Sequence, residues 1–328
     1  MANEKENYLY LHRKQLINNF NLIFVHSEIN HIIILLIIIS NLYGQNEVKL
    51  IISGKGRQNF LNESFYQQPS FVLINGKRND ICKKSCDFET EINNITIKFN
   101  DLINSCEKMF DGLNNITEVD LSNLDTSKVI SMAFMFNNCN NLLKINFDNI
   151  NTSLVQNMSY LFHYCTKLTS IDVSNFDTSN VDNMYYMFKH CESLLSIDVS
   201  KFNTEKVQNM EDLFASCYNL TSIDVSNFVT SKVKDIRGMF YECLKLRKVD
   251  LKNFNTSLVT NFMGLIEKSN LIIYINLLKF TIREGDIINK IFENTNSNLK
   301  ICINDIQSQN ILKNKYQYKT YNCEDICF

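Results

Sequence analysis

The sequence predicts an α/β solenoid in which a parallel sheet forms one face, short helices form the other, and caps close both ends. Three observations predict it. Cysteines recur every 26 residues between Cys139 and Cys243. A short alternating apolar segment follows, which is typical of a half-buried strand. A second apolar stripe, with spacings of three and four residues, is typical of a short helix.

Composition limits the class of protein. The 328-residue chain is 45% hydrophobic and 21% charged, which is enough apolar content for a core. Its net charge of −2 gives no broad basic surface, so we do not expect nucleic acid as a partner. One Pro and eight Gly are too few for a sandwich of many tight hairpins.

Residues 1–44 are predicted to be a signal peptide or an N-terminal anchor. The apolar run Ile32–Ile39 would span about 12 Å as a helix, which is too short to cross a bilayer and suits a secretory signal. Cleavage near Gly44 is one interpretation. An uncleaved anchor that includes residues 22–25, or a buried core element, are the alternatives.

Residues 45–105 are non-repeating and are predicted to form an N-terminal cap, because the outermost repeats of a solenoid need shielding. Apolar runs at Val48–Ile52, Phe71–Ile74 and Ile95–Phe99 predict strands. The pair Asn75-Gly76 is typical of a tight turn.

Residues 106–282 are predicted to form about seven repeats of 26 residues. In one repeat, Leu168–Val173 has strand alternation, and the stripe from Val181 to Cys191 has helical spacing. Thr178 and Ser179 precede that stripe and are candidate helix N-caps. Stacked repeats would align like side chains in columns, and we expect these columns to be the main stabilising feature.

A unit of one strand and one helix every 26 residues falls within the range of leucine-rich repeats. The segment Leu168–Cys191, LTSIDVSNFDTSNVDNMYYMFKHC, resembles the repeat of BspA-like leucine-rich-repeat surface proteins. The resemblance covers residues 106–282. It implies a cell-surface solenoid that binds host cells, matrix proteins or other microbes, and it implies no enzymatic activity.

The final repeat departs from the motif, with Ile266, Ser269 and Ile282 where Phe, Cys and Thr are expected. This change indicates that the array ends there. Residues 283–328 are therefore predicted to form a C-terminal cap.

A ligand-binding surface is predicted on the exposed side of the strands, where outward side chains vary on a regular frame. A column of Asp and Asn residues lies at its centre, and two interpretations of it remain open. The column binds a basic partner or, weakly, Ca²⁺, or its side chains are simply solvated. The candidate residues are Glu118, Asp120, Lys144, Asn146, Ser170, Asp172, Ser196, Asp198, Ser222, Asp224, Lys248 and Asp250.

The cysteines fall into two groups. The column Cys139, Cys165, Cys191, Cys217 and Cys243 is predicted to be buried free thiols, because neither zinc nor disulfide geometry suits a line of parallel side chains. The flanks hold Cys82, Cys86, Cys106, Cys302, Cys323 and Cys327. Secretion would favour one bond in each cap: Cys82–Cys106 or Cys86–Cys106, and Cys302–Cys323 or Cys302–Cys327.

No catalytic, metal or cofactor site is predicted. His163 and His190 lie beside cysteines that the pattern buries, and no nucleotide-binding or hydrolase motif is present. We therefore expect a secreted or cell-surface module that binds protein or glycan macromolecules, with membrane contact only through the N-terminal segment or an associated protein. The alternative is an intracellular adaptor for protein–protein interaction, and a hidden enzyme site has no residue-level support.

Overall fold

The structure is a computed structural model that describes residues 46–316 and 320–321. Three sheets are formed by these residues. The first has six strands in the order β4-β3-β6-β1-β7-β8, the second has four in the order β12-β11-β10-β9, and the third pairs β2 with β5. The bounds are β1 Glu47–Ser53, β2 Gly56–Asn59, β3 Phe71–Ile74, β4 Lys77–Asn79, β5 Ser85–Phe88, β6 Ile92–Lys98, β7 Ile116–Asp120, β8 Lys144–Asn146, β9 Lys248–Asp250, β10 Tyr274–Asn276, β11 Lys300–Cys302 and β12 Thr320–Tyr321.

The predicted α/β leucine-rich-repeat solenoid is wrong. Among residues 46–316 and 320–321 there is one α-helix, α3 (Ile306–Lys315), and it lies outside the predicted repeats. The strands form several sheets, one mixed, one antiparallel and one parallel, in place of a single parallel sheet. Leu168–Val173, where a repeat strand was predicted, form no strand.

The strands predicted in the N-terminal region are confirmed. β1, β3 and β6 occur at the three predicted runs, and β1 pairs antiparallel with both β6 and β7. β7 then pairs parallel with β8, so one sheet joins this region to the repeats. Asn75 and Gly76 both have positive φ and connect β3 to β4, as the tight-turn prediction requires.

The predicted helical half of each repeat consists of turns. Left-handed residues recur four apart, such as Tyr186 (φ 60°) and His190 (φ 59°), and a right-handed helix cannot contain them. Backbone amides alternate between two partners: the Met187 amide donates to Met184 in its own repeat, whereas the Phe188 amide donates to Leu213 in the next. Carbonyl groups that would accept hydrogen bonds within a helix therefore accept them from the neighbouring repeat instead.

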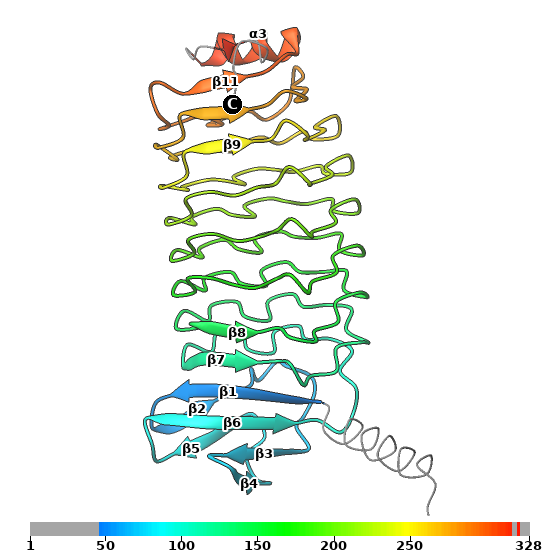
Figure 1. The fold of residues 1–328 in the computed structure, drawn as a ribbon, viewed down its shortest axis with the longest axis vertical. Helices are drawn as coiled ribbons and strands as arrows, with labels where there is room; N and C mark the ends of the chain where they lie inside the picture. Colours follow the sequence, from blue (N-terminus) through cyan, green and yellow to red (C-terminus); the bar gives the residue numbers. More distant parts are fainter. Residues whose placement is uncertain (1–45, 317–319, 322–328) are drawn as a thin grey trace, which may run out of the picture. The chain divides into compact units, whose positions relative to one another are not determined.

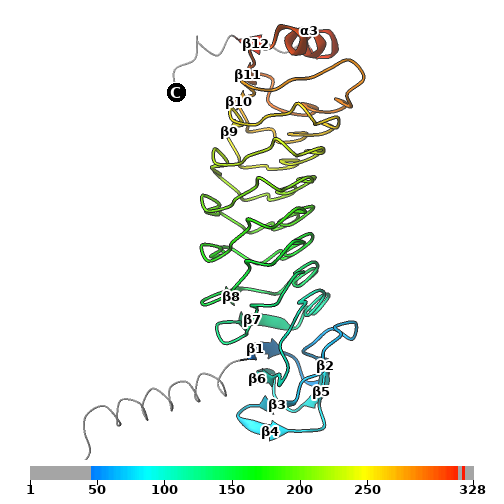
Figure 2. The ribbon, with the colours of Figure 1, turned by 90° about the vertical axis from the view of Figure 1, so that its right-hand side faces the viewer.

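Successive repeats lie one above another and are joined on this side (Figures 1 and 2). Parallel bridges link residues 26 apart from Ser131–Asn157 through to Asn261–Ile287. We call this side, residues 157–165 and their equivalents, the turn side, and the side of residues 144–146 and equivalents the strand side. The turn pattern continues past residue 282, because Lys290 and Asn294 are again left-handed and β11 extends the parallel sheet.

Buried threonines join the repeats at the corner between these sides. The Thr178 hydroxyl donates to the Asn203 carbonyl (2.9 Å) and accepts from the Asn203 amide (2.8 Å). Thr152 and Thr204 make the same pair of bonds with the residues 25 positions later. Thr178 therefore bridges two repeats instead of capping a helix.

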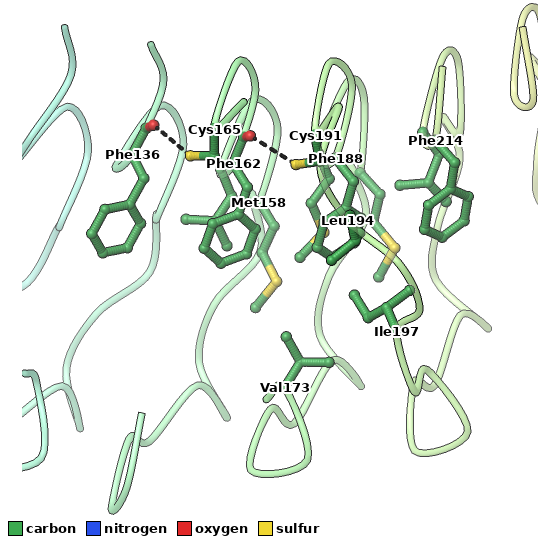
Figure 3. Close-up of a cluster of buried hydrophobic side chains, with 14 of the residues drawn as sticks. Phe136, Met158, Phe162, Cys165, Val173, Phe188, Cys191, Leu194, Ile197 and Phe214 are labelled. Carbon is green, nitrogen blue, oxygen red and sulfur yellow. Dashed lines mark hydrogen bonds between the residues drawn. The ribbon is translucent and has the colours of Figure 1, made fainter. Parts of the chain in front are cut away.

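The core is a set of side-chain columns (Figure 3). Consecutive phenylalanines from Phe110 to Phe240 stack with ring centroids 5.4–5.8 Å apart, and all are fully buried. Beside them, each column cysteine directs its thiol at a carbonyl of the previous repeat, as Cys191 Sγ does to Phe162 at 3.2 Å. Burial of these large apolar side chains is expected to stabilise the fold.

Candidate functional site

The twelve residues predicted for ligand binding lie on the strand side of the repeats, in segments that differ in secondary structure. Four of them, Glu118, Asp120, Lys144 and Asn146, line a depression of about 550 Å³ over the six-stranded sheet. Six lie on the central repeats, where no strands form: Ser170, Asp172, Ser196, Asp198, Ser222 and Asp224. The last two, Lys248 and Asp250, belong to β9 in a different sheet.

The depression, which we call the sheet depression, combines repeat strands with the N-terminal strands. Lys49 on β1 and Thr96 on β6 line it together with the four predicted residues. Opposite charges lie in register across its strands, because Lys49 pairs with Asp120 and Glu118 pairs with Lys144. Sequence reasoning assigned β1 and β6 to a cap and so missed their contribution. The contribution of β1 and β6 follows only from the order of the strands in the sheet, which places β1 beside β7.

The central aspartates have a structural role. Oδ1 of Asp172, Asp198 and Asp224 accepts the amide of the serine two residues later at 2.9 Å, forming an Asx turn. Hydrogen bonds from these serines hold the pKa of each carboxyl below its usual value. Asn146 and Asn276 make the same turn, which explains why Asn can replace Asp in this column. The column is therefore accounted for without a ligand.

The structure places the cysteine column as buried free thiols. Burial raises the pKa of Cys217 to about 12, so the thiolate is not formed at neutral pH. In the N-terminal region, Cys82 bonds to Cys86 and Cys106 is a buried free thiol, so neither predicted bond to Cys106 is formed. Cys302 is disulfide-bonded, and the candidate partners Cys323 and Cys327 lie outside the described residues.

Aromatic side chains gather on the turn side of consecutive repeats. We call them the aromatic cluster: Phe134, Tyr160, His163, Tyr164, Tyr185, Tyr186, His190 and Tyr218. Ring centroids of Phe134 and Tyr160 lie 4.3 Å apart, and those of Tyr164 and His190 lie 4.1 Å apart. Tyr160 also contacts Tyr185 and Tyr186 at about 5 Å. The cluster is half-buried, so part of it faces solvent.

Charged groups around the cluster are engaged with one another. Lys189 bonds to Asp212 at 2.5 Å and lies 3.9 Å from the centroid of the Tyr186 ring. Arg237 pairs with Glu211. Burial raises the pKa of Tyr185 and Tyr186 to about 12, so both phenols stay protonated.

The two histidines are neutral at physiological pH. Burial lowers the pKa of His163 to about 3, and His190 and Lys189 add to the effect. His163 Nδ1 lies 2.7 Å from Asn137 Oδ1, and Asn137 in turn donates to Asp111. Burial likewise lowers the pKa of His190, whose Nδ1 lies 3.5 Å from a Glu192 carboxylate oxygen.

Five members of the cluster have left-handed backbones: Phe134, Tyr160, Tyr164, Tyr186 and His190. This conformation costs an L-residue with a bulky side chain roughly 1–2 kcal/mol. Elsewhere the same two columns are also left-handed and hold both glycines and long side chains, so this conformation is a feature of every repeat. The residues are Lys108, Gly112, Asn138, Asp212, Ser216, Gly238, Glu242, Gly264, Lys268, Lys290 and Asn294. Sequence reasoning missed the cluster, although successive Tyr residues at equivalent positions were a visible signal.

The described residues hold no group of three or more His, Cys, Asp or Glu side chains arranged to bind a metal ion. The one α-helix among the described residues, α3, is neither long nor apolar enough to cross a membrane. The predicted signal or anchor at residues 1–44 lies outside the described residues.

Comparison with protein-family models gives a match in two segments, residues 104–223 and 208–322. Together they span more than half of the chain and extend beyond the predicted repeat boundary at residue 282. No curated protein and no solved structure matches the chain. The match is compatible with a BspA-like repeat protein, but it does not establish leucine-rich repeats. The chain belongs to the family described as Mycoplasma protein of unknown function, DUF285.

Proposed function

We propose that this protein is a non-catalytic binding module that recognises a protein partner through the sheet depression. The observation that carries the proposal is the depression of about 550 Å³, with charges of both signs placed in register on paired strands. Strand backbones hold these side chains in fixed positions. A preorganised surface loses little conformational entropy when it binds.

The charge pattern indicates the partner's chemistry. Lys49 and Lys144 alternate with Glu118 and Asp120 across three neighbouring strands. A protein surface with the complementary pattern would meet opposite charges at each strand and be oriented by them. A uniformly basic or acidic partner would meet a like charge at every second position.

The cysteine chemistry supports a secreted or cell-surface location. Cys82 and Cys86 form a disulfide, and Cys302 forms another. Such bonds persist mainly in oxidising compartments. An intracellular adaptor would keep these cysteines reduced, so we prefer the surface-binding proposal, with host or matrix macromolecules as targets.

Binding to immobilised fibronectin, laminin and collagen, and to intact host cells, would test the proposal. We expect saturable binding to at least one target that falls at least tenfold in Glu118→Lys and in Lys144→Glu. The control is Asp182→Lys, an exposed charge outside the depression. Binding to none of these targets, or equal binding by all variants, would contradict the proposal.

A further inference from the structure

A small depression in the N-terminal region gathers positive charge. It has a volume of about 320 Å³ and includes the loop between β4 and β5. Arg57, Lys83 and Lys84 line it together with one acidic residue, Glu63. We call it the basic depression. The chain as a whole has a net charge of −2, so this local excess of positive charge is opposite in sign to the overall balance.

The ammonium of Lys84 is buried without an anionic partner among the described residues. Only 9% of the surface of Lys84 is exposed, and its Nζ donates to the carbonyl oxygens of Glu63 and Phe65, both at 2.6 Å. These carbonyls accept two of its three N–H groups but carry no formal charge. No ion pair formed within residues 46–316 and 320–321 includes Lys84. Burying a charge costs free energy unless an opposite charge accompanies it, so an anion bound here would be stabilised.

The other two cations of the depression are held only weakly. Lys83 Nζ lies 3.3 Å from the Ser70 carbonyl oxygen and 3.5 Å from that of Pro69. The guanidinium of Arg57 lies 3.6 Å from the Asp87 carboxylate, and both side chains are more than 60% exposed. Water screens an exposed pair of this kind, so it contributes little to stability. Lys83 and Arg57 can therefore bind a ligand without breaking a strong contact.

Neutral hydrogen-bonding groups accompany the three cations. Ser85 and Gln68 line the same depression, and within the part of the chain that the structure describes their side chains make no hydrogen bond. A sulfate or phosphate group has several oxygen atoms, each of which accepts hydrogen bonds, and bonds from charged donors are the strongest. A guanidinium can contact two of those oxygens at once. This combination of charged and neutral donors matches such an oxyanion.

The loop that carries the two lysines is fixed at both ends. The disulfide between Cys82 and Cys86 encloses Lys83 and Lys84. Asn79 Oδ1 accepts two backbone amides at the start of the loop, both at 2.9 Å. Directly after the loop, β5 pairs antiparallel with β2. The donors are therefore preorganised, which lowers the entropic cost of binding.

We propose that the basic depression binds a tetrahedral oxyanion, the sulfate or phosphate group of a larger ligand. Its volume of about 320 Å³ is roughly ten times the ~30 Å³ that one water molecule occupies in the liquid. An oxyanion of five heavy atoms therefore leaves room for the group to which it is esterified. Ile81, whose surface is 90% exposed, also lines the depression and offers that group an apolar contact. The basic depression shares no lining residue with the sheet depression, so the two are tested separately.

Isothermal titration calorimetry at constant ionic strength would test the proposal. The ligands are glucose 6-sulfate, glucose 6-phosphate, inorganic sulfate and inorganic phosphate, with glucose as the uncharged reference. We expect saturable binding of one molecule of at least one ester, weaker binding of the corresponding free ion, and no binding of glucose. Equal affinity for the ester and the free ion would overturn the assignment to a larger ligand. No binding by either ester or either ion would overturn the whole proposal.

Substitutions identify the site. The double variant Arg57→Gln, Lys83→Gln changes two exposed side chains, so we expect it to fold normally and to bind the ester about tenfold more weakly or worse. Glu63→Gln should strengthen binding by about twofold, because it removes the acidic group beside the anion. The control is Lys55→Gln, because Lys55 is also exposed and pairs with Glu91 at 3.7 Å but does not line the depression. Unchanged affinity in the double variant, or an equal loss in the control, would overturn the proposal.

Discussion

The turn side and the strand side of the repeats are built differently. On the turn side, backbone bridges join each repeat to the next from Ser131 to Ile287. On the strand side, β-ladders occur at β7–β8 and at β9–β11, whereas residues 167–173 and 193–199 between them form no strand. The central repeats are held together by turns, buried threonines and stacked rings, and on the strand side by single backbone bonds such as that from the Leu195 amide to the Thr169 carbonyl. Strand alternation in a sequence does not guarantee a sheet when other bonds fix the repeat spacing.

The largest expected effect comes from opening the phenylalanine column. Phe188→Ala should lower the free energy of unfolding by about 3–5 kcal/mol, because a fully buried ring is lost between two stacked neighbours. Ile171→Ala on the strand side should cost less than about 2 kcal/mol, since that side chain is only partly buried. Urea unfolding of both variants measures the difference. Equal losses would show that the strand side contributes as much as the turn side.

Removing one threonine bridge should have an intermediate effect. Thr204→Val keeps the side-chain shape but leaves the Val229 amide and carbonyl without the hydroxyl partner, which should cost about 1–3 kcal/mol. The matched control is Thr221→Val on the strand side, where the hydroxyl is exposed and its bond is 3.3 Å long, and we expect less than about 0.5 kcal/mol. Thermal melts at neutral pH compare them. Equal melting temperatures of the Thr204→Val and Thr221→Val variants would show that the buried hydroxyl stabilises the fold no more than the exposed one.

Acid should weaken the turn side through His163. Burial lowers its folded pKa to about 3, so the unfolded chain takes up the proton first as the pH falls below about 6.5. Stability is therefore complete above pH 6.5 and declines toward pH 3. At pH 5 we expect a loss of about 1 kcal/mol, roughly half the unscreened value because the ring is partly exposed. In unfolding experiments between pH 7 and 4, His163→Gln should remove this dependence of the free energy of unfolding on pH. If the dependence is unchanged in the variant, other titrating groups cause it.

The smallest effect should come from the strand-side aspartates. Serine hydrogen bonds lower the folded pKa of Asp172, Asp198 and Asp224, so their contribution is present above the unfolded pKa of about 3.9 and is lost as the pH falls through the folded values. Changing all three to Asn keeps the Asx turns, as at Asn146. We expect a small decrease in the melting temperature at pH 7, because the contribution of the ionised carboxylates is lost, and a shallower decline below pH 4. A marked loss at pH 7 would show that the charge itself matters.

Much of the core followed from the pattern of residues. The 26-residue period placed the Phe, Cys and Val columns, and their members are buried. The strands β1 and β3 and the Asn75-Gly76 turn were also predicted from local sequence. The disulfide Cys82–Cys86 was not, because a pairing depends on which side chains the fold brings together.

The candidate sites were only partly predictable. Glu118 and Lys144 were identified as exposed strand residues, but the antiparallel insertion of β1 beside β7 completes their depression. The aromatic cluster depends on left-handed turns that bring Tyr160 beside Tyr186, and helical spacing does not predict them.

The sequence by itself determined the repeat period and which side chains are buried, because apolar residues at equivalent positions must be removed from water together. Only the tertiary structure decided how the backbone follows that period. A spacing of three and four residues fits a helix and a series of turns equally well. The choice depends on whether each carbonyl bonds within its own repeat or, as the Leu213 carbonyl does with the Phe188 amide, with the neighbouring one.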